Sequence, residues 1–181
     1  MPISQNNLIK YARQYTDLNE SIVYKAEGTR LAAFTAFSTA FLCHSHHDVD
    51  LVKGLIARFA AEEIELYVDW QDKDMPETTN KVTAQKIQER IAAADYFLFL
   101  ATANSKGSRW CPWEIGYADA KDKPVLIIPT IDGIGTYGNE YLQLYRRIDE
   151  GTGKQDKTLS GLSLYVPGKT TGEWLKSIVN K

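Results

Sequence analysis

Short apolar runs alternate with amphipathic stretches along the chain. Apolar residues recur three and four positions apart in residues 51–60 and 84–94, as in helices that bury one face. Runs typical of strands occupy residues 39–43, 64–68, 96–100, 125–128 and 162–166. Because strands and helices alternate, the pattern predicts an α/β fold with a central parallel five-stranded sheet and helices on both faces.

The two ends of the chain and one internal stretch follow other patterns. Apolar residues at helical spacing near the N-terminus predict that residues 1–37 form a short helical extension ahead of a domain of residues 38–181. Residues 131–160 are rich in glycine, and we assign them no regular structure except a short helix through Tyr141, Leu144 and Tyr145. A C-terminal helix is expected to run through Trp174.

Composition narrows the class of protein. With 181 residues, 44% of them hydrophobic, the chain can form one globular core. Its formal net charge is -2 and its basic residues are mixed with acidic ones, which argues against a nucleic-acid partner. The apolar runs are too short to span a bilayer and no signal peptide is visible, so we expect a cytoplasmic protein without a membrane partner. The two cysteines, Cys43 and Cys111, fit reduced, buried thiols.

Three polar loops follow the first three predicted strands. In an open parallel sheet, ligands bind outside the carboxyl ends of the strands, so residues 43–48, 69–83 and 102–112 are the candidate site loops. None of them carries a glycine-rich phosphate-binding fingerprint, which argues against a hydride-transferring dinucleotide enzyme. A nucleotide would have to be held by side chains and by backbone N–H groups at helix starts.

One segment carries a family resemblance. Residues 110–118, with the sequence WCPWEIGYA, resemble the helix of TIR (Toll/interleukin receptor) domains that holds a W-x-x-x-E catalytic motif, matched here by Trp110 and Glu114. Residues 40–45 are similar to the box 1 strand of that family, and the strand and loop after residue 64 occupy the place of its BB loop. The order and spacing of these parts agree over residues 38–130, so the resemblance implies a flavodoxin-like TIR fold.

The resemblance also implies an activity. Bacterial TIR proteins, including the TIR subunits of Thoeris antiphage systems, are similar in size and motif, which implies cleavage or cyclisation of NAD⁺. NAD⁺ would then be a consumed substrate, and neither a cofactor nor a metal is implied. The family further implies self-association through TIR–TIR contacts. In defence, the reaction would either make a nucleotide product that signals to a downstream effector protein or deplete NAD⁺. Because the family includes non-catalytic adaptors, a scaffold remains open.

The chemistry suits a single glutamate. Breaking the nicotinamide–ribose bond builds positive charge on the ribose, as in glycoside hydrolysis, but the leaving group departs neutral and needs no general acid. Glu114 is therefore predicted to stabilise the developing cation, and Trp110 to offer a flat face to nicotinamide or ribose. The helix is expected to begin near Pro112, with Trp113 and Tyr117 facing the core on either side of the glutamate.

The remaining predicted substrate contacts come from two loops. They are Cys43, His44, Ser45 and His46 after the first strand and Trp70 after the second. The three histidines also invite a zinc hypothesis, but one loop seldom closes a metal site alone, so we predict no metal. A Ser–His–Asp hydrolase is disfavoured because sequence neighbours rarely form that geometry and no G-x-S-x-G elbow occurs.

Two other functions compete with NAD⁺ cleavage. A non-catalytic TIR interaction module predicts assembly through the loop of residues 69–83 and indifference to the loss of Glu114. A nucleoside deoxyribosyltransferase-like enzyme, which also uses a glutamate on ribose, predicts turnover of deoxynucleosides and none of NAD⁺. The sequence leaves open whether NAD⁺ cleavage yields linear ADP-ribose, a cyclic isomer or a conjugate, and it does not give the oligomeric state.

Overall fold

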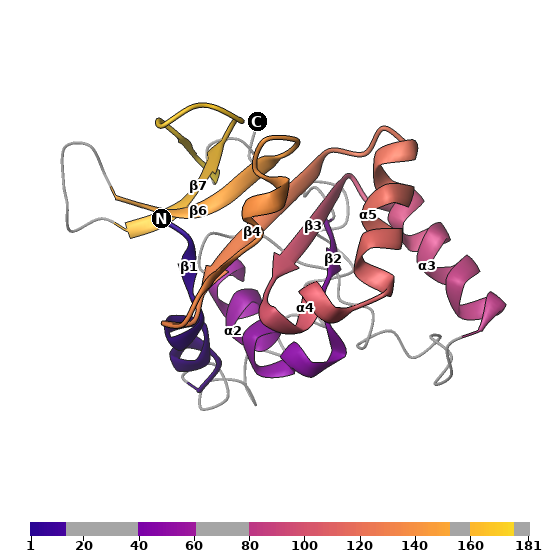
Figure 1. The fold of residues 1–181 in the computed structure, drawn as a ribbon, viewed down its shortest axis with the longest axis horizontal. Helices are drawn as coiled ribbons and strands as arrows, with labels where there is room; N and C mark the ends of the chain where they lie inside the picture. The colour runs from indigo at the N-terminus through magenta and orange to yellow at the C-terminus, as the bar shows by residue number, and fades with distance from the viewer. Residues whose placement is uncertain (14–39, 61–79, 153–159, 176–181) are drawn as a thin grey trace, which may run out of the picture.

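One largely parallel sheet organises the part of the chain that the structure describes. The computed structural model describes residues 1–13, 40–60, 80–152 and 160–175 (Figure 1). Its eight strands within these residues form one sheet, with the main path β2-β3-β4-β6-β7-β8. The centre consists of β2 (Ala40–Cys43), β3 (Tyr96–Ala101) and β4 (Val125–Ile131), which pair in parallel. The α/β class with a largely parallel sheet is thereby confirmed, whereas the strand predicted at residues 64–68 lies outside the described residues.

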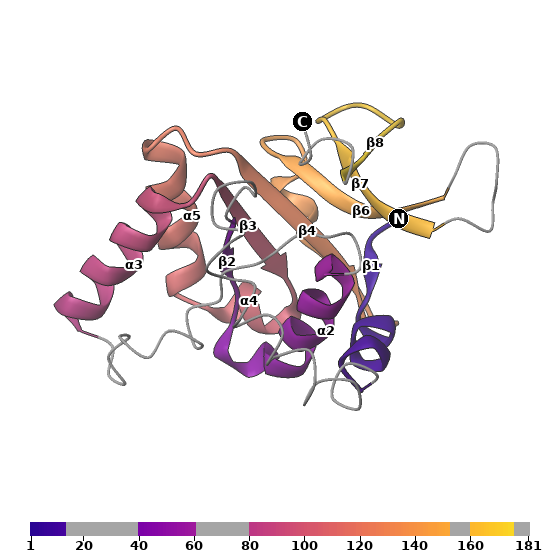
Figure 2. The ribbon, with the colours of Figure 1, turned by 180° about the vertical axis from the view of Figure 1, so that it is seen from behind.

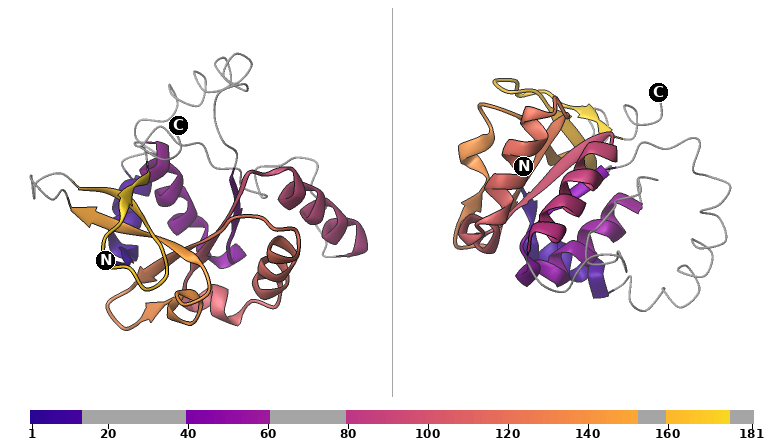
Figure 3. Two further views of the ribbon diagram at one scale, coloured as in Figure 1. Left: turned by 90° about the horizontal axis from the view of Figure 1, so that it is seen from above. Right: turned by 90° about the vertical axis from the view of Figure 1, so that its right-hand side faces the viewer.

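Helices cover both faces of this sheet, as predicted. Helix α2 (Val49–Ala60) lies on one face, and α3 (Lys81–Ala93) and α5 (Trp110–Ala120) lie on the other, which Figures 2 and 3 show from further directions. Alternate residues of β3 enter the two separate hydrophobic clusters, Leu98 on the α2 face and Phe97 on the α5 face. The continuous apolar runs of the central strands are therefore explained by burial on both sides.

The sheet ends in antiparallel strands on one side, where the sequence prediction was wrong. Strand β6 (Arg146–Thr152) pairs in parallel with β4 but lies in the segment assigned no regular structure. The last predicted strand exists as β7 (Ser160–Tyr165), yet it runs antiparallel to β6, so the sheet is not parallel throughout. Trp174 belongs to the short strand β8 (Glu173–Trp174) rather than to a helix, because it pairs with Ser163 of β7.

The shorter elements connect these layers near the strand ends. The loop after β2 contains the 3-10 helix η1 (His46–Asp48), and the loop after β3 contains the helix α4 (Ala103–Gly107). Strand β5 (Thr136–Tyr137) returns along β4, and the 3-10 helix η3 (Asn139–Tyr141) follows it. The helix expected through Tyr141, Leu144 and Tyr145 is therefore shorter than predicted and ends at Tyr141. In the described residues, no helix combines the length and apolar character needed to cross a membrane.

The N-terminal residues are joined to the same core. Strand β1 (Ile3–Ser4) pairs in parallel with the end of β4, opposite Thr130 and Ile131. The helix that follows, described for residues 5–13, lies beside α2 (Figure 1), and its Leu8 is fully buried. The described part of the predicted extension therefore contributes to the sheet and to the core. The boundary predicted at residue 37 lies outside the described residues and stays a prediction.

Candidate functional site

The site predicted around Glu114 lies where the carboxyl end of β2 meets the first turns of α5. Cys43 is the last residue of β2, and the loop after it leads into η1. Helix α5 begins at Trp110, two residues before Pro112, because Ser108 Oγ accepts hydrogen bonds from the backbone N–H groups of Trp110 (3.2 Å) and Cys111 (3.3 Å). The proline falls within the first turn, where its missing N–H is tolerated.

Glu114 lies on the inner face of α5. Its side chain is 7% exposed and shares the buried face with Cys111, Ile115 and Ala118. The expectation that Trp113 faces the core was wrong, since Trp113 is 37% exposed, whereas the half-buried Tyr117 does pack against the core cluster on this face of the sheet. Of the aromatic rings on α5, those of Trp110 and Tyr117 pack at the edge of this core cluster, and that of Trp113 lies at the surface. The glutamate is consequently held in an environment with little water.

Two thiols lie next to this carboxylate. Cys43 and Cys111 are both buried and both reduced, as expected from the sequence. The pKa of Cys43 is raised well above its usual value, first by burial and then by its hydrogen bond to Cys111 and by the negative charge of Glu114. The pKa of Cys111 is lowered because it shares that hydrogen bond with Cys43. Cys43 therefore remains a protonated thiol, which makes it a hydrogen-bond donor near Glu114 and a poor nucleophile.

The loop after β2 presents only some of its polar side chains. Ser45 is 4% exposed, and its hydroxyl accepts the backbone N–H of His47 at 3.4 Å, which caps η1. His44 is half-buried, with its Nδ1 3.1 Å from the carbonyl oxygen of Leu42. His46 is exposed, and its ring lies 3.8 Å from that of His47. Of the predicted contacts in this loop, His46 and part of His44 thus face solvent, whereas Cys43 and Ser45 point inward.

Asp48 ties this loop to the next one, which sequence reasoning missed. It is 3% exposed and accepts hydrogen bonds from Thr102 Oγ1 and Asn104 Nδ2, each at 2.6 Å. Thr102 in turn caps α4 by accepting the backbone N–H of Ser105 at 3.0 Å. Because the carboxylate of Asp48 binds Thr102 and Asn104, the arrangement agrees with the rejection of a Ser–His–Asp hydrolase. No local pattern in the sequence indicates this role, because both partners lie more than fifty residues further along the chain.

Aromatic rings continue from the site along the outer side of α5. The half-buried ring of Trp110 meets Trp113 edge-on at 5.3 Å, and Trp113 stacks on Tyr117 at 6.2 Å. Trp110 is thus held in place by a neighbouring ring one turn along the helix. Trp70, the other aromatic residue predicted to contact substrate, lies outside the described residues.

A small cavity lies beside the first turn of α5. Its volume is about 50 Å³, and it is lined by Thr102, Ser105 and Lys106 around α4 and by Pro112, Glu140 and Tyr141 opposite them, among others. This volume is far below that of typical small-molecule sites. The loop predicted at residues 69–83 ends earlier than expected, because α3 begins at Lys81. Residues 69–79 of this loop lie outside the described residues. Within the described part of the chain, no group of three or more His, Cys, Asp or Glu side chains is placed to hold a metal ion.

Comparison with known proteins adds a family to this geometry. A family model described as TIR domain matches residues 40–160, which include both Cys43 and Glu114. The chain is 35% identical over 117 residues to the "Probable 3' cyclic ADP-D-ribose synthase ThsB'" of Bacillus cereus (strain MSX-D12), covering 62% of this chain and 61% of that protein. It is 30% identical over 95 residues to the "Putative cyclic ADP-D-ribose synthase TIR2" of Cytobacillus dafuensis, covering 51% of this chain and 25% of that protein.

These similarities cover the chain and its relatives only in part. The chain spans less than two thirds of the length of either curated relative. Among solved structures, a conserved protein from Enterococcus faecalis V583 matches 51% of this chain and 63% of its own with a TM-score of 0.43 and 21% sequence identity.

Proposed function

Because the chain belongs to the TIR domain family, we propose that it is an enzyme that cleaves the nicotinamide–ribose bond of NAD⁺. The observation that carries the proposal is the position of Glu114: a buried carboxylate at the carboxyl end of β2, within the region that the family model matches. Two relatives named as cyclic ADP-D-ribose synthases support the same class of substrate. The proposal places NAD⁺ as a consumed substrate rather than as a cofactor.

The proposed role of Glu114 is electrostatic. When the bond between the ribose carbon and the nicotinamide nitrogen breaks, the electron pair leaves with nicotinamide, which becomes neutral, and positive charge develops on the ribose. A carboxylate that is already in place and shielded from water attracts this charge more strongly than one in bulk solvent. The thiol of Cys43 remains protonated next to Glu114, so it does not compete as the nucleophile.

The product depends on which nucleophile captures the ribose cation. Water would give linear ADP-ribose, whereas an atom of the same nucleotide would close a ring. The names of the two relatives favour the cyclic product, and we extend the proposal to a cyclic nucleotide that signals to a downstream effector in antiphage defence. Self-association through TIR–TIR contacts is part of the same proposal.

The test uses concentrated protein, a crowding agent and two substrates, NAD⁺ and a deoxynucleoside with an acceptor base. Nicotinamide release is measured and the ribosyl product is identified by its mass. Glu114→Gln keeps the shape of the side chain and removes its charge, and Asp119→Asn removes an exposed carboxylate from the same helix as a control. We expect wild type and the control to release nicotinamide and Glu114→Gln to lose this activity by about a hundredfold or more.

Two outcomes would replace the proposal. Turnover of the deoxynucleoside without nicotinamide release would identify a deoxyribosyltransferase-like enzyme. Equal assembly of wild type and Glu114→Gln without any turnover would identify an interaction module.

A further inference from the structure

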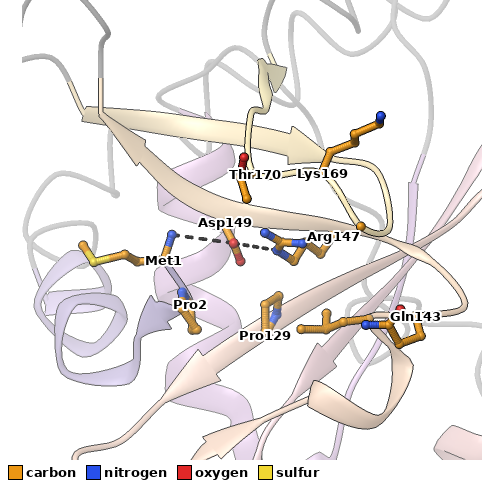
Figure 4. A pocket seen from close by; sticks show the side chains of 10 residues that line it. Met1, Pro2, Pro129, Gln143, Arg147, Asp149, Lys169 and Thr170 are labelled. Carbon is orange, nitrogen blue, oxygen red and sulfur yellow. Dashed lines mark hydrogen bonds and ion pairs between the residues drawn. The ribbon is translucent and has the colours of Figure 1, made fainter.

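A second, larger cavity lies away from Glu114, beyond β4. Its volume is about 510 Å³, within the range of small-molecule sites. It is open to solvent on one side and is lined by Met1 and Pro2, by the end of β4 and the residues after η3, by β6, and by the turn at residues 168–170 (Figure 4). Glu114 does not line this cavity, so the two places are separate. Nothing in the proposed cleavage of NAD⁺ uses it.

Arg147 on β6 is the central cation of this cavity. Its Nε donates a hydrogen bond to Asp149 Oδ2 at 2.8 Å, and its guanidinium carbon lies 4.5 Å from the centre of the Tyr165 ring. The side chain is 21% exposed and is thus held on two sides with its tip still accessible. Within the described residues, no hydrogen bond is found for its terminal N–H groups, which leaves a planar set of donors in a fixed orientation.

Asp149 sets the charge behind Arg147. It is 4% exposed, and its Oδ2 lies 3.6 Å from the amino group of Met1 as well as close to Arg147 (Figure 4). Arg147 thus lies directly against a buried carboxylate, which fixes the orientation of the guanidinium at this wall. The other oxygen of Asp149, Oδ1, has no hydrogen-bond partner within the described part of the chain. Because this oxygen is itself buried, Asp149 meets the cavity through its contact with Arg147.

The remaining walls suit a ligand with an apolar part. Pro2, Pro129 and Leu142 line one side, and Gln143 and Thr170 add polar groups. Lys169 stands at the opening, where the turn from Val166 closes with a 3.1 Å hydrogen bond, and Figure 4 shows its amine extending away from Arg147. The lysine therefore adds positive charge at the mouth rather than a fixed contact inside.

We propose that this cavity is a second ligand site, which takes a phosphate-bearing small molecule of about mononucleotide size with its phosphate on Arg147. A guanidinium offers two parallel N–H donors to a phosphate, the geometry for which arginine is favoured over lysine. The apolar walls accommodate a base or sugar. The site is distinct from Glu114 and requires no turnover.

The test measures the binding of AMP, adenosine and inorganic phosphate by calorimetry, with amide chemical shifts to locate them. AMP is expected to shift the amides of Gln143 and Thr170 and to bind more tightly than either fragment. Arg147→Lys keeps the positive charge but loses the fork, and we expect it to weaken AMP binding about tenfold, the loss of one hydrogen bond to a charged group. Lys169→Glu is expected to weaken binding in a salt-dependent way, and Lys81→Glu on α3 is the matched surface control.

Several results would overturn the proposal. The first is that AMP does not bind at millimolar concentration. The second is that wild type and both variants, Arg147→Lys and Lys169→Glu, bind AMP with equal affinity. The third is that inorganic phosphate binds as tightly as AMP. Because Lys169 is exposed, its variant keeps the test valid even if Arg147→Lys fails to fold. The Glu114→Gln protein should bind AMP as wild type does, and loss of binding there would assign AMP to the other site. Failure of NAD⁺ cleavage would leave this binding test unaffected.

Discussion

Replacing Gly54 by alanine tests how closely the N-terminal helix packs on α2. Gly54 lies within α2, and a methyl group added there would be 1.9 Å from the carbonyl oxygen of Leu8 and 2.5 Å from its carbonyl carbon. An ordinary contact begins near 3.4 Å, so the backbone at Leu8 must move by about 1.5 Å. Backbone atoms cannot rotate away as a flexible side chain can, and the N-terminal segment itself must shift.

The size of the effect follows from two opposing contributions. Alanine stabilises the interior of a helix by about 1 kcal/mol relative to glycine. Overpacking costs about 1–3 kcal/mol, and displacing the segment exposes Ile3 and Leu8, each of which contributes about 1.5–3 kcal/mol when fully buried. Both side chains are 0% exposed, so the clash should outweigh the helix propensity. We expect Gly54→Ala to lower the free energy of unfolding by about 1–4 kcal/mol.

Urea and thermal unfolding measure this change, and amide exchange locates it. Gly116→Ala is the matched control, because that glycine also lies inside a helix, α5, and an added methyl group would have no atom within 4 Å. The control should be stabilised by up to about 1 kcal/mol, or about 2–4 °C in Tm. If Gly54→Ala were stabilised to the same degree without faster exchange in residues 5–13, the packing of the N-terminal helix described above would be refuted.

Three further predictions concern the loops and the thiols. Asp48→Ala removes two buried hydrogen bonds to a charged group and should lower the free energy of unfolding by about 3 kcal/mol or more. Asp50→Ala at the surface should change it by less than about 0.5 kcal/mol. Equal effects of the two variants would contradict the hydrogen bonds from Thr102 and Asn104 to Asp48. The hydrogen bond from the hydroxyl of Tyr137 lowers the pKa of Asp132 from 3.8. The β4–β5 turn should therefore be fully stabilised above pH 3.8 and lose this stabilisation as the pH falls through the lower pKa of Asp132 in the folded protein. An Asp132 carboxyl that titrates at 3.8 by NMR would disprove this. Because burial raises the pKa of Cys43, alkylation of this residue, located by peptide mass, should be slow at about pH 8 until the protein unfolds; rapid labelling of Cys43 in the native protein would argue against the buried thiol.

The central strands could be predicted from the sequence, whereas the edge of the sheet could not. β3 and β4 are continuous apolar runs because helices cover both of their faces. In β6, Ile148 is the one large apolar side chain among charged neighbours, so the strand resembles a loop in any local pattern. Its charged residues Arg147 and Asp149 line the large cavity, which explains why a polar sequence is stable there.

The candidate site was predictable to a similar degree. Glu114 was identified through a family motif. Helical periodicity placed Tyr117 correctly against the core but Trp113 wrongly, because the apolar Trp113 lies at the surface beside the buried stripe of α5. The role of Asp48 gave no local signal, since its partners lie 54 and 56 residues further along the chain. Contacts of this kind depend on how the strands are ordered in space.

The rate of nicotinamide release from NAD⁺ by the Glu114→Gln protein is the most direct test of the central claim. Wild type and the variant are compared at equal concentration, after unfolding curves have shown that both are folded. The account predicts that wild type releases nicotinamide and that the variant does so at a rate lower by about a hundredfold or more, because the charge at residue 114 stabilises the ribose cation. Equal rates for the two folded proteins would contradict the assignment of Glu114 as the catalytic residue.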